Sequence, residues 1–210
     1  MPALEVDHVL IATPDLAAGA RLIAEAFGLA SVDGGRHPGW GTANRIVALG
    51  DCYLELVAVV DTGVAATNAF GRWVGSASTT RPLGWAVRTT NLDDVAGRLG
   101  MAVAAGSRKT PTGDELRWRT AGLERAADEP SLPFFIEWAK ATRLPGRTAA
   151  PTGRPAGVVR LELTGDRDRL MTWLGHADFP IDVRAGPPAI DAVVLRQGDD
   201  ELRLAEIAAS

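Results

Sequence analysis

The chain has 210 residues, 46% of them hydrophobic and 23% charged, which is the ordinary composition of a globular protein with a substantial core. Its net charge of −4 at pH 7 gives no basic footprint, so we expect no nucleic-acid partner. The single cysteine, Cys52, excludes an internal disulfide and a multi-cysteine zinc site. With no charged leader and no apolar run near the roughly 20 residues that span a bilayer, we expect a cytoplasmic protein with no membrane partner.

The first 60 residues are predicted to form a strand, a helix and three further strands. Asp15 is the expected N-cap of the helix, whose apolar residues recur at helical spacing, and Gly28 is its expected stop. A glycine-punctuated loop over 37–44 interrupts the strands that follow. The expected elements are a strand over 4–12, a helix over 16–27, and strands over 32–36, 45–49 and 53–59.

The same order of elements recurs twice more, at a spacing of roughly 75 residues, which marks an internal repeat. The second copy is predicted to have a strand over 83–88, a helix over 92–99 and strands over 103–105, 115–120 and 134–139. The third is predicted to have a strand over 158–164, a helix over 167–174 and strands over 181–183, 190–196 and 201–207.

The connections between the copies predict the domain boundaries. Residues 61–81 look like a connector with a short amphipathic helix around 70–74, and 142–156 is a linker rich in Pro, Gly and Arg. We therefore expect a paired domain over 1–141, made of units 1–60 and 82–141, and a degenerate third unit over 157–210.

One strand, Tyr53–Val59, carries a carboxylate in the middle of an apolar run. Burying Glu55 as an anion is costly unless a cation, a metal ion or hydrogen-bond donors meet it. The chain offers His8 in an earlier apolar strand, and a second strand of the same plan with Glu137 at its centre. The pattern predicts that these three side chains converge in one cavity.

Two pairs of segments resemble known families. His8–Leu16, with Leu54-Glu55-Leu56, resembles the vicinal oxygen chelate superfamily, which includes the glyoxalase I, bleomycin-resistance and extradiol dioxygenase types. More closely, His37–Asn44 and Ile136-Glu137-Trp138 resemble the glyoxalase-like domain family. This resemblance, which covers nearly the whole chain, implies an α+β fold. Two βαβββ units would pair into a curled, open β-barrel with outer helices, beside a degenerate third βαβββ-like unit.

The resemblance also implies a metal site, with ligands on the first and last strands of each unit. His8, Glu55 and Glu137 are the implied ligands, and the two glutamates are the implied catalytic carboxylates. Gly84 stands where the second unit would supply its histidine, and His37 is a candidate replacement. Zn²⁺, Ni²⁺, Mn²⁺ or Fe²⁺ accepts imidazole and carboxylate ligands, leaves positions for two adjacent substrate oxygens, and acts as a Lewis acid.

Substrate contacts are expected from the 37–44 loop and from a tryptophan of the cup wall. Each candidate also has a purely structural interpretation: a tight loop with positive φ at Gly39 and Gly41, core packing of the tryptophans, a hydrogen-bonded core His8, and glutamates paired with arginines. The expected substrate contacts are His37, Trp40, Thr42, Asn44 and Trp118. The candidate arginine partners are Arg45, Arg117 and Arg119.

Two functional hypotheses follow from these residues and the resemblance. The first is a metal-dependent lyase, isomerase or dioxygenase that acts on a small molecule with adjacent oxygens. The alternative is a metal-free module that binds or sequesters a hydrophobic or aromatic compound, as bleomycin-resistance-type relatives do. The unpaired third unit could cover its sheet edges in a homodimer. The sequence has no nucleophile elbow, dinucleotide fingerprint or phosphate loop.

Overall fold

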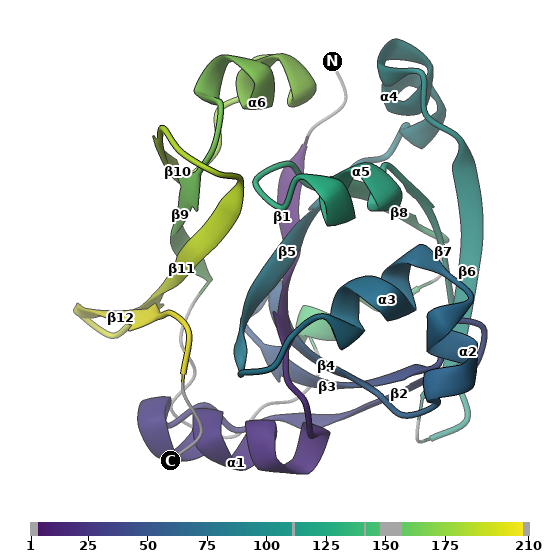
Figure 1. Ribbon diagram of the computed structural model, residues 1–210, viewed down its shortest axis with the longest axis vertical. Helices are drawn as coiled ribbons and strands as arrows, with labels where there is room; N and C mark the ends of the chain where they lie inside the picture. Colours follow the sequence, from purple (N-terminus) through teal and green to yellow (C-terminus); the bar gives the residue numbers. More distant parts are fainter. Residues whose placement is uncertain (1–3, 111, 141, 148–156, 208–210) are drawn as a thin grey trace.

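The first two units of the computed structural model form one curled sheet; the model describes residues 4–110, 112–140, 142–147 and 157–207 (Figure 1). The first unit comprises β1 (Glu5–Ala12), α1 (Leu16–Phe27), β2 (Val32–His37), β3 (Thr42–Ala48) and β4 (Tyr53–Val59). The second comprises β5 (Arg81–Arg88), α4 (Leu92–Leu99), β6 (Val103–Lys109), β7 (Glu115–Ala121), α5 (Leu123–Asp128) and β8 (Phe134–Trp138). The connector between them forms α2 (Thr62–Ala66) and α3 (Ala69–Gly75).

The eight strands are ordered β2-β3-β4-β1-β5-β8-β7-β6. In each unit the first strand pairs in parallel with the last, β1 with β4 and β5 with β8, and the two units join through antiparallel β1 and β5. The edge strands β2 and β6 meet where Arg108 Nη1 donates a hydrogen bond to the Gly34 carbonyl. The sheet is therefore a nearly closed barrel, and the predicted α+β fold of paired units is confirmed.

Alternation along the strands decides which side chains face the inside of the barrel. Along β1, Val9 and Ile11 join the outer hydrophobic cluster, whereas His8 and Leu10 line an inner cavity. The parallel register sets Glu55 of β4 opposite Leu10 of β1, so both lie on the inner face. One register thus brings His8 and Glu55 to the same side of the sheet.

Helix α3 lies across the barrel (Figure 1) and packs its aromatic side chains into the inner hydrophobic cluster. Phe70, Trp73 and Val74 are buried there. A Cβ on Gly84 would lie 2.6 Å from Trp73 Cζ2 and closer still to Cη2, so Trp73 occupies the space beside this glycine. The position at which the second unit would supply a histidine is therefore filled by an indole ring from the connector.

The third unit packs outside the barrel, and its βαβββ order is confirmed. It consists of β9 (Val158–Thr164), α6 (Arg167–Trp173), β10 (Ile181–Arg184), β11 (Ala189–Gln197) and β12 (Asp200–Leu204). Its sheet is ordered β10-β9-β11-β12, so β9 pairs in parallel with the second strand of the unit rather than with the last. Leu161 and Val193 share the outer hydrophobic cluster with Trp85 and Phe135 of the barrel.

Several element boundaries differ from the predicted ones. Strand β6 runs to Lys109, four residues beyond the predicted end at residue 105. The prediction stopped short because the second half of this strand is polar and shows no apolar alternation. Helix α5 was not predicted, since it starts after Gly122 in the left-handed conformation without a side-chain cap. The predicted linker over 142–156 includes a 3₁₀ turn, Pro145–Arg147, but its residues 148–156 lie outside the described chain. No helix of the described chain is long and apolar enough to cross a membrane.

The packing of Trp73 on Gly84 generates a stability prediction. We expect Gly84→Ala to lower the free energy of unfolding by about 1–3 kcal/mol, because the new methyl group forces a buried indole to move. Urea denaturation measures the effect. The matched control is Gly97→Ala on the exposed face of α4, where a Cβ meets nothing within 4 Å and stability should rise slightly. Equal effects of the two substitutions would contradict the packing argument.

Candidate functional site

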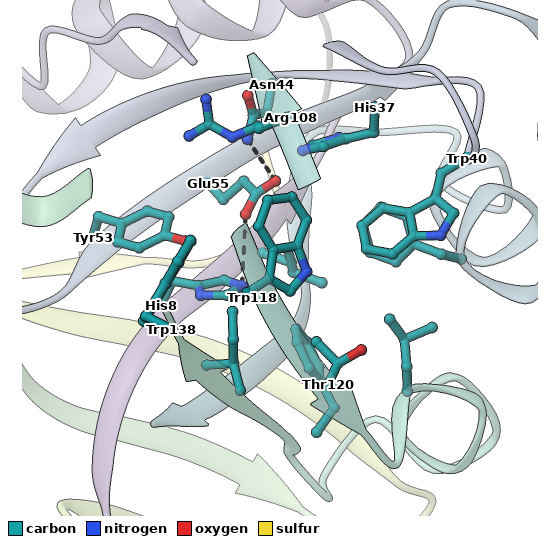
Figure 2. Close-up of a pocket in the computed structure, with 15 residues that line it drawn as sticks. His8, His37, Trp40, Asn44, Tyr53, Glu55, Arg108, Trp118, Thr120 and Trp138 are labelled. Atoms are coloured by element: carbon teal, nitrogen blue, oxygen red, sulfur yellow. Dashed lines mark hydrogen bonds and ion pairs between the residues drawn. The ribbon is translucent and has the colours of Figure 1, made fainter. Parts of the chain in front are cut away.

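The inner face of the barrel encloses a cavity of ≈ 30 Å³ between the sheet and helices α3 and α5 (Figure 2). One part of its wall is polar and the other is aromatic. The polar side chains are His8, His37, Asn44, Glu55, Arg108 and Thr120. The aromatic side chains are Trp40, Tyr53, Phe70, Trp118, Phe134 and Trp138.

Glu55 is the centre of the polar wall and is only 6% exposed. Its Oε1 accepts a hydrogen bond of 2.7 Å from Asn44 Nδ2, and its Oε2 lies 3.5 Å from His8 Nε2 (Figure 2). These two partners meet the need of a buried carboxylate for donors. The oxygen of the same amide group, Asn44 Oδ1, is buried and has no hydrogen-bond partner among the described residues.

His8 connects Glu55 to a second buried carboxylate. Its Nδ1 lies 2.7 Å from Asp7 Oδ1, and Asp7 Oδ2 accepts hydrogen bonds from Trp138 Nε1 at 3.0 Å and from Arg88 at 3.3 Å. Tyr53 stacks on the imidazole with a centroid distance of 4.7 Å. Burial holds the pKa of the Tyr53 phenol well above its usual range, so this ring is an uncharged wall. The result is a fixed carboxylate–imidazole–carboxylate chain.

His37, at the end of β2, is the second imidazole of the cavity. Its Nδ1 and the Thr42 hydroxyl are 3.1 Å apart, and its ring contacts Trp40 and Trp118. Burial lowers the pKa of His37 to about 4, Arg108 and His8 act in the same direction, and Glu55 partly opposes them. His37 is therefore uncharged at neutral pH.

The aromatic wall is built from rings in mutual contact. Trp40 lies 4.7 Å from Phe70 and 6.1 Å from Trp118 between ring centroids, and Trp118 meets Trp138 edge-on at 5.6 Å. These side chains come from the turn between β2 and β3, α3, β7 and β8, so the wall joins both units and the connector. Such offset and edge-on rings form an apolar surface suited to a flat ligand.

Glu137 does not share this cavity, which corrects the prediction that three acidic and imidazole groups converge there. On β8, Ile136 and Trp138 line the cavity, so Glu137 points to the opposite face of the sheet. There it accepts a hydrogen bond of 2.9 Å from Arg119, which also pairs with Asp93 at 3.0 Å. Glu137 is thus paired with Arg119, in agreement with the purely structural interpretation of this residue.

The other predicted contacts fall into two groups. His37, Trp40, Asn44 and Trp118 lie on the cavity wall, whereas Thr42 stands behind His37. Sequence analysis missed the contributions of Asp7, Tyr53 and Arg108. Asp7 carried a detectable signal, an acidic residue next to His8 inside an apolar strand. Arg108 lies in the part of β6 beyond the predicted end of that strand, so its orientation toward the cavity could be found only with the full length of β6.

The residues of this wall do not fit the predicted divalent metal ion. The described residues contain no group of three or more His, Cys, Asp or Glu side chains that could hold one. Both ring nitrogens of His8 face carboxylate oxygens, and Glu55 accepts a hydrogen bond from Asn44. Glu137 lies on the other face of the sheet. The indole of Trp73 fills the space beside Gly84. Imidazole and carboxylate donors are thus turned toward each other rather than toward a shared point.

The lowered pKa of His37 generates a prediction of pH-dependent stability. Between about pH 6.5 and 4 the unfolded chain binds a proton on this residue that the folded chain does not, so stability falls as the pH falls. We expect wild type to lose up to about 3 kcal/mol more than His37→Asn over this range. Urea denaturation at several pH values measures the difference. His176→Asn, at an exposed position, should keep the wild-type slope, and a wild-type slope in His37→Asn would contradict the assignment.

Comparison with known proteins places the chain in a family. The profile of a family described as "Glyoxalase-like domain" matches residues 6–177. No curated protein matches the chain in sequence. A hypothetical protein from Staphylococcus aureus has a similar structure, with a TM-score of 0.66 and 15% identity over 97% of this chain and 86% of that one.

Weaker structural similarity extends to methylmalonyl-CoA epimerases. The enzyme from Mycobacterium tuberculosis has a TM-score of 0.46 and 17% identity over 65% of this chain and 88% of that one. A Streptomyces coelicolor epimerase variant in complex with 2-nitronate-propionyl-CoA has a TM-score of 0.46 and 18% identity over 65% and 97%. Because the family profile spans most of the sequence, the chain belongs to the glyoxalase-like domain family.

Proposed function

We propose that this protein binds a small planar molecule in the inner cavity and does so without a metal ion. The observation that supports this proposal is the composition of the cavity wall: contacting aromatic rings beside a buried, hydrogen-bonded carboxylate. Ligand sites in proteins commonly combine apolar walls with a few fixed polar groups. Of the two functions considered from sequence, the metal-free binding module agrees better with this donor set than the metal-dependent enzyme.

Ligand entry requires side chains to move, because a cavity of ≈ 30 Å³ holds little more than water. Trp40, Phe70, Thr120 and Leu123 line both this cavity and an outer hollow of ≈ 530 Å³. They form the partition between the two spaces. A ligand in the outer hollow would therefore reach Glu55 by displacing the rings and the leucine of this partition.

Proton transfer on the bound molecule is a second candidate function, favoured by the Glu55–His8–Asp7 chain. Glu55 faces the cavity as a carboxylate that could accept a proton, and His8 lies behind it at 3.5 Å. Asp7 fixes the ring through the 2.7 Å contact at Nδ1. In a lyase or isomerase reaction, Glu55 would be the general base and His8 and Asp7 would position it.

A calorimetric titration with 1-naphthol in buffer containing EDTA tests the binding proposal. We expect saturable binding, weakened about 10-fold by Glu55→Gln because a hydrogen bond to a charged acceptor is lost. Glu137→Gln is the matched control and should bind as wild type, since its carboxylate lies on the other face of the sheet. Trp118→Leu should weaken binding about 3- to 10-fold through the lost ring contacts.

Three outcomes of this titration would contradict the proposal. One is binding that appears only after Zn²⁺ or Mn²⁺ is added to the EDTA-treated protein. Another is an equal loss in Glu55→Gln and Glu137→Gln, which would place the ligand outside the inner cavity. The third is no binding to wild type. Circular dichroism of each variant confirms that it is folded.

A further inference from the structure

Arg108 is the only arginine or lysine that is buried in the described part of the chain, with 6% of its surface exposed. It lies on β6 and lines the inner cavity from the side of the second unit. Figure 2 draws Arg108 among the residues that line this cavity, together with Asn44 and Glu55. A positive charge in this position is costly unless an anion meets it.

The described part of the chain supplies no such anion at contact distance. Among the described residues, no carboxylate oxygen lies within the 4.0 Å that defines an ion pair with Arg108. Its hydrogen bond runs from Nη1 to the carbonyl oxygen of Gly34, a neutral acceptor. A guanidinium has five N–H donors, so most of its donor capacity remains for a group in the cavity.

The carboxylates at the polar wall already have hydrogen-bond or ion-pair partners. Asn44 and His8 meet the Glu55 carboxylate, and Asp7 is met by His8, Arg88 and the indole of Trp138. His37 is uncharged at neutral pH, so it neither competes for an anion nor compensates one. Among the described residues of the cavity wall, Arg108 is therefore the charged side chain with no ion-pair partner and with a single neutral hydrogen-bond acceptor.

We propose that Arg108 binds a carboxylate group of the ligand, so that the molecule bound in the inner cavity is a planar, aromatic carboxylate. This inference rests on the proposed binding function and specifies the class of ligand. The planar guanidinium can donate two parallel hydrogen bonds to a carboxylate, which adds geometric selectivity to charge. The tryptophan and phenylalanine rings of the wall contact the aromatic body, while Glu55 and Asn44 limit where the carboxylate can lie.

Calorimetric titration of 1-naphthoate and of its neutral isostere 1-naphthamide at pH 7 tests this inference. We expect the wild-type protein to bind the carboxylate roughly 10-fold or more tightly than the amide. Arg108→Gln should remove the preference for the carboxylate over the amide. Arg117→Gln is the matched control, because Arg117 is exposed on β7 and pairs with Glu115. It should retain the full preference.

Arg108→Lys separates the effect of the positive charge from the effect of the paired N–H donors of the guanidinium. Lysine keeps the charge but loses the paired donors, so we expect a preference between those of wild type and Arg108→Gln. Circular dichroism verifies each variant, and if Arg108→Gln does not fold, the comparison rests on Arg108→Lys. An unchanged preference in Arg108→Lys would then overturn the role of the guanidinium.

The outcomes distinguish this inference from the function on which it rests. Equal binding of carboxylate and amide to wild type would leave the binding function standing and overturn the role of Arg108. A preference that persists in Arg108→Gln would do the same. Failure of both compounds to bind wild type would overturn the binding function and this inference together.

Discussion

The parallel register of β1 against β4 is the constraint on which the rest of the site depends. It puts Leu10 opposite Glu55, and the two-residue period of a strand then brings His8 to the same inner face. A shift of β1 by one residue would turn Val9 into the cavity and His8 into the outer hydrophobic cluster, on the opposite face from Glu55. The register is held by the outer residues Leu54, Leu56 and Ile11, which are fully buried. The core outside the barrel therefore fixes the chemistry inside it.

Within this frame, the two buried carboxylates of the site have hydrogen-bond or ion-pair partners. Asn44 and His8 meet Glu55, and Asp7 meets His8, so each carboxylate has a donor on at least one side. These partners explain how the carboxylate of Glu55 can be buried in the apolar strand β4. They also explain why the imidazole and carboxylate are not arranged around a common point in space, as a metal site requires. The inner wall of the barrel is thus organised around hydrogen bonds, and among the described residues the Arg108 guanidinium has no ion-pair partner there.

The sequence predicted the barrel, the unit order and most of the wall, because these follow from apolar periodicity and from the repeat. The phase of a single strand was harder to predict. On β8 the residues on both faces are bulky and apolar, Phe134 and Ile136 on one and Phe135 on the other, so the pattern did not reveal that Glu137 faces outward. Arg108 was missed for a related reason, since the polar half of β6 shows no alternation. Gly84 was recognised as a missing ligand, but the ring that fills its place comes from a connector whose packing no local pattern reveals.

The closure of the barrel at its two edges has a further consequence. Strands β2 and β6 share no ladder of backbone hydrogen bonds in the described chain, and their junction depends on Arg108 and on Gly35. Gly35 has φ +135°, and a side chain there would collide with the Lys109 carbonyl. The seam between β2 and β6 is thus held by a side-chain hydrogen bond and by close packing at a glycine, and not by a backbone ladder of the described residues. Since the same arginine closes the seam and lines the cavity, binding of a ligand to Arg108 would be thermodynamically linked to closure of the barrel.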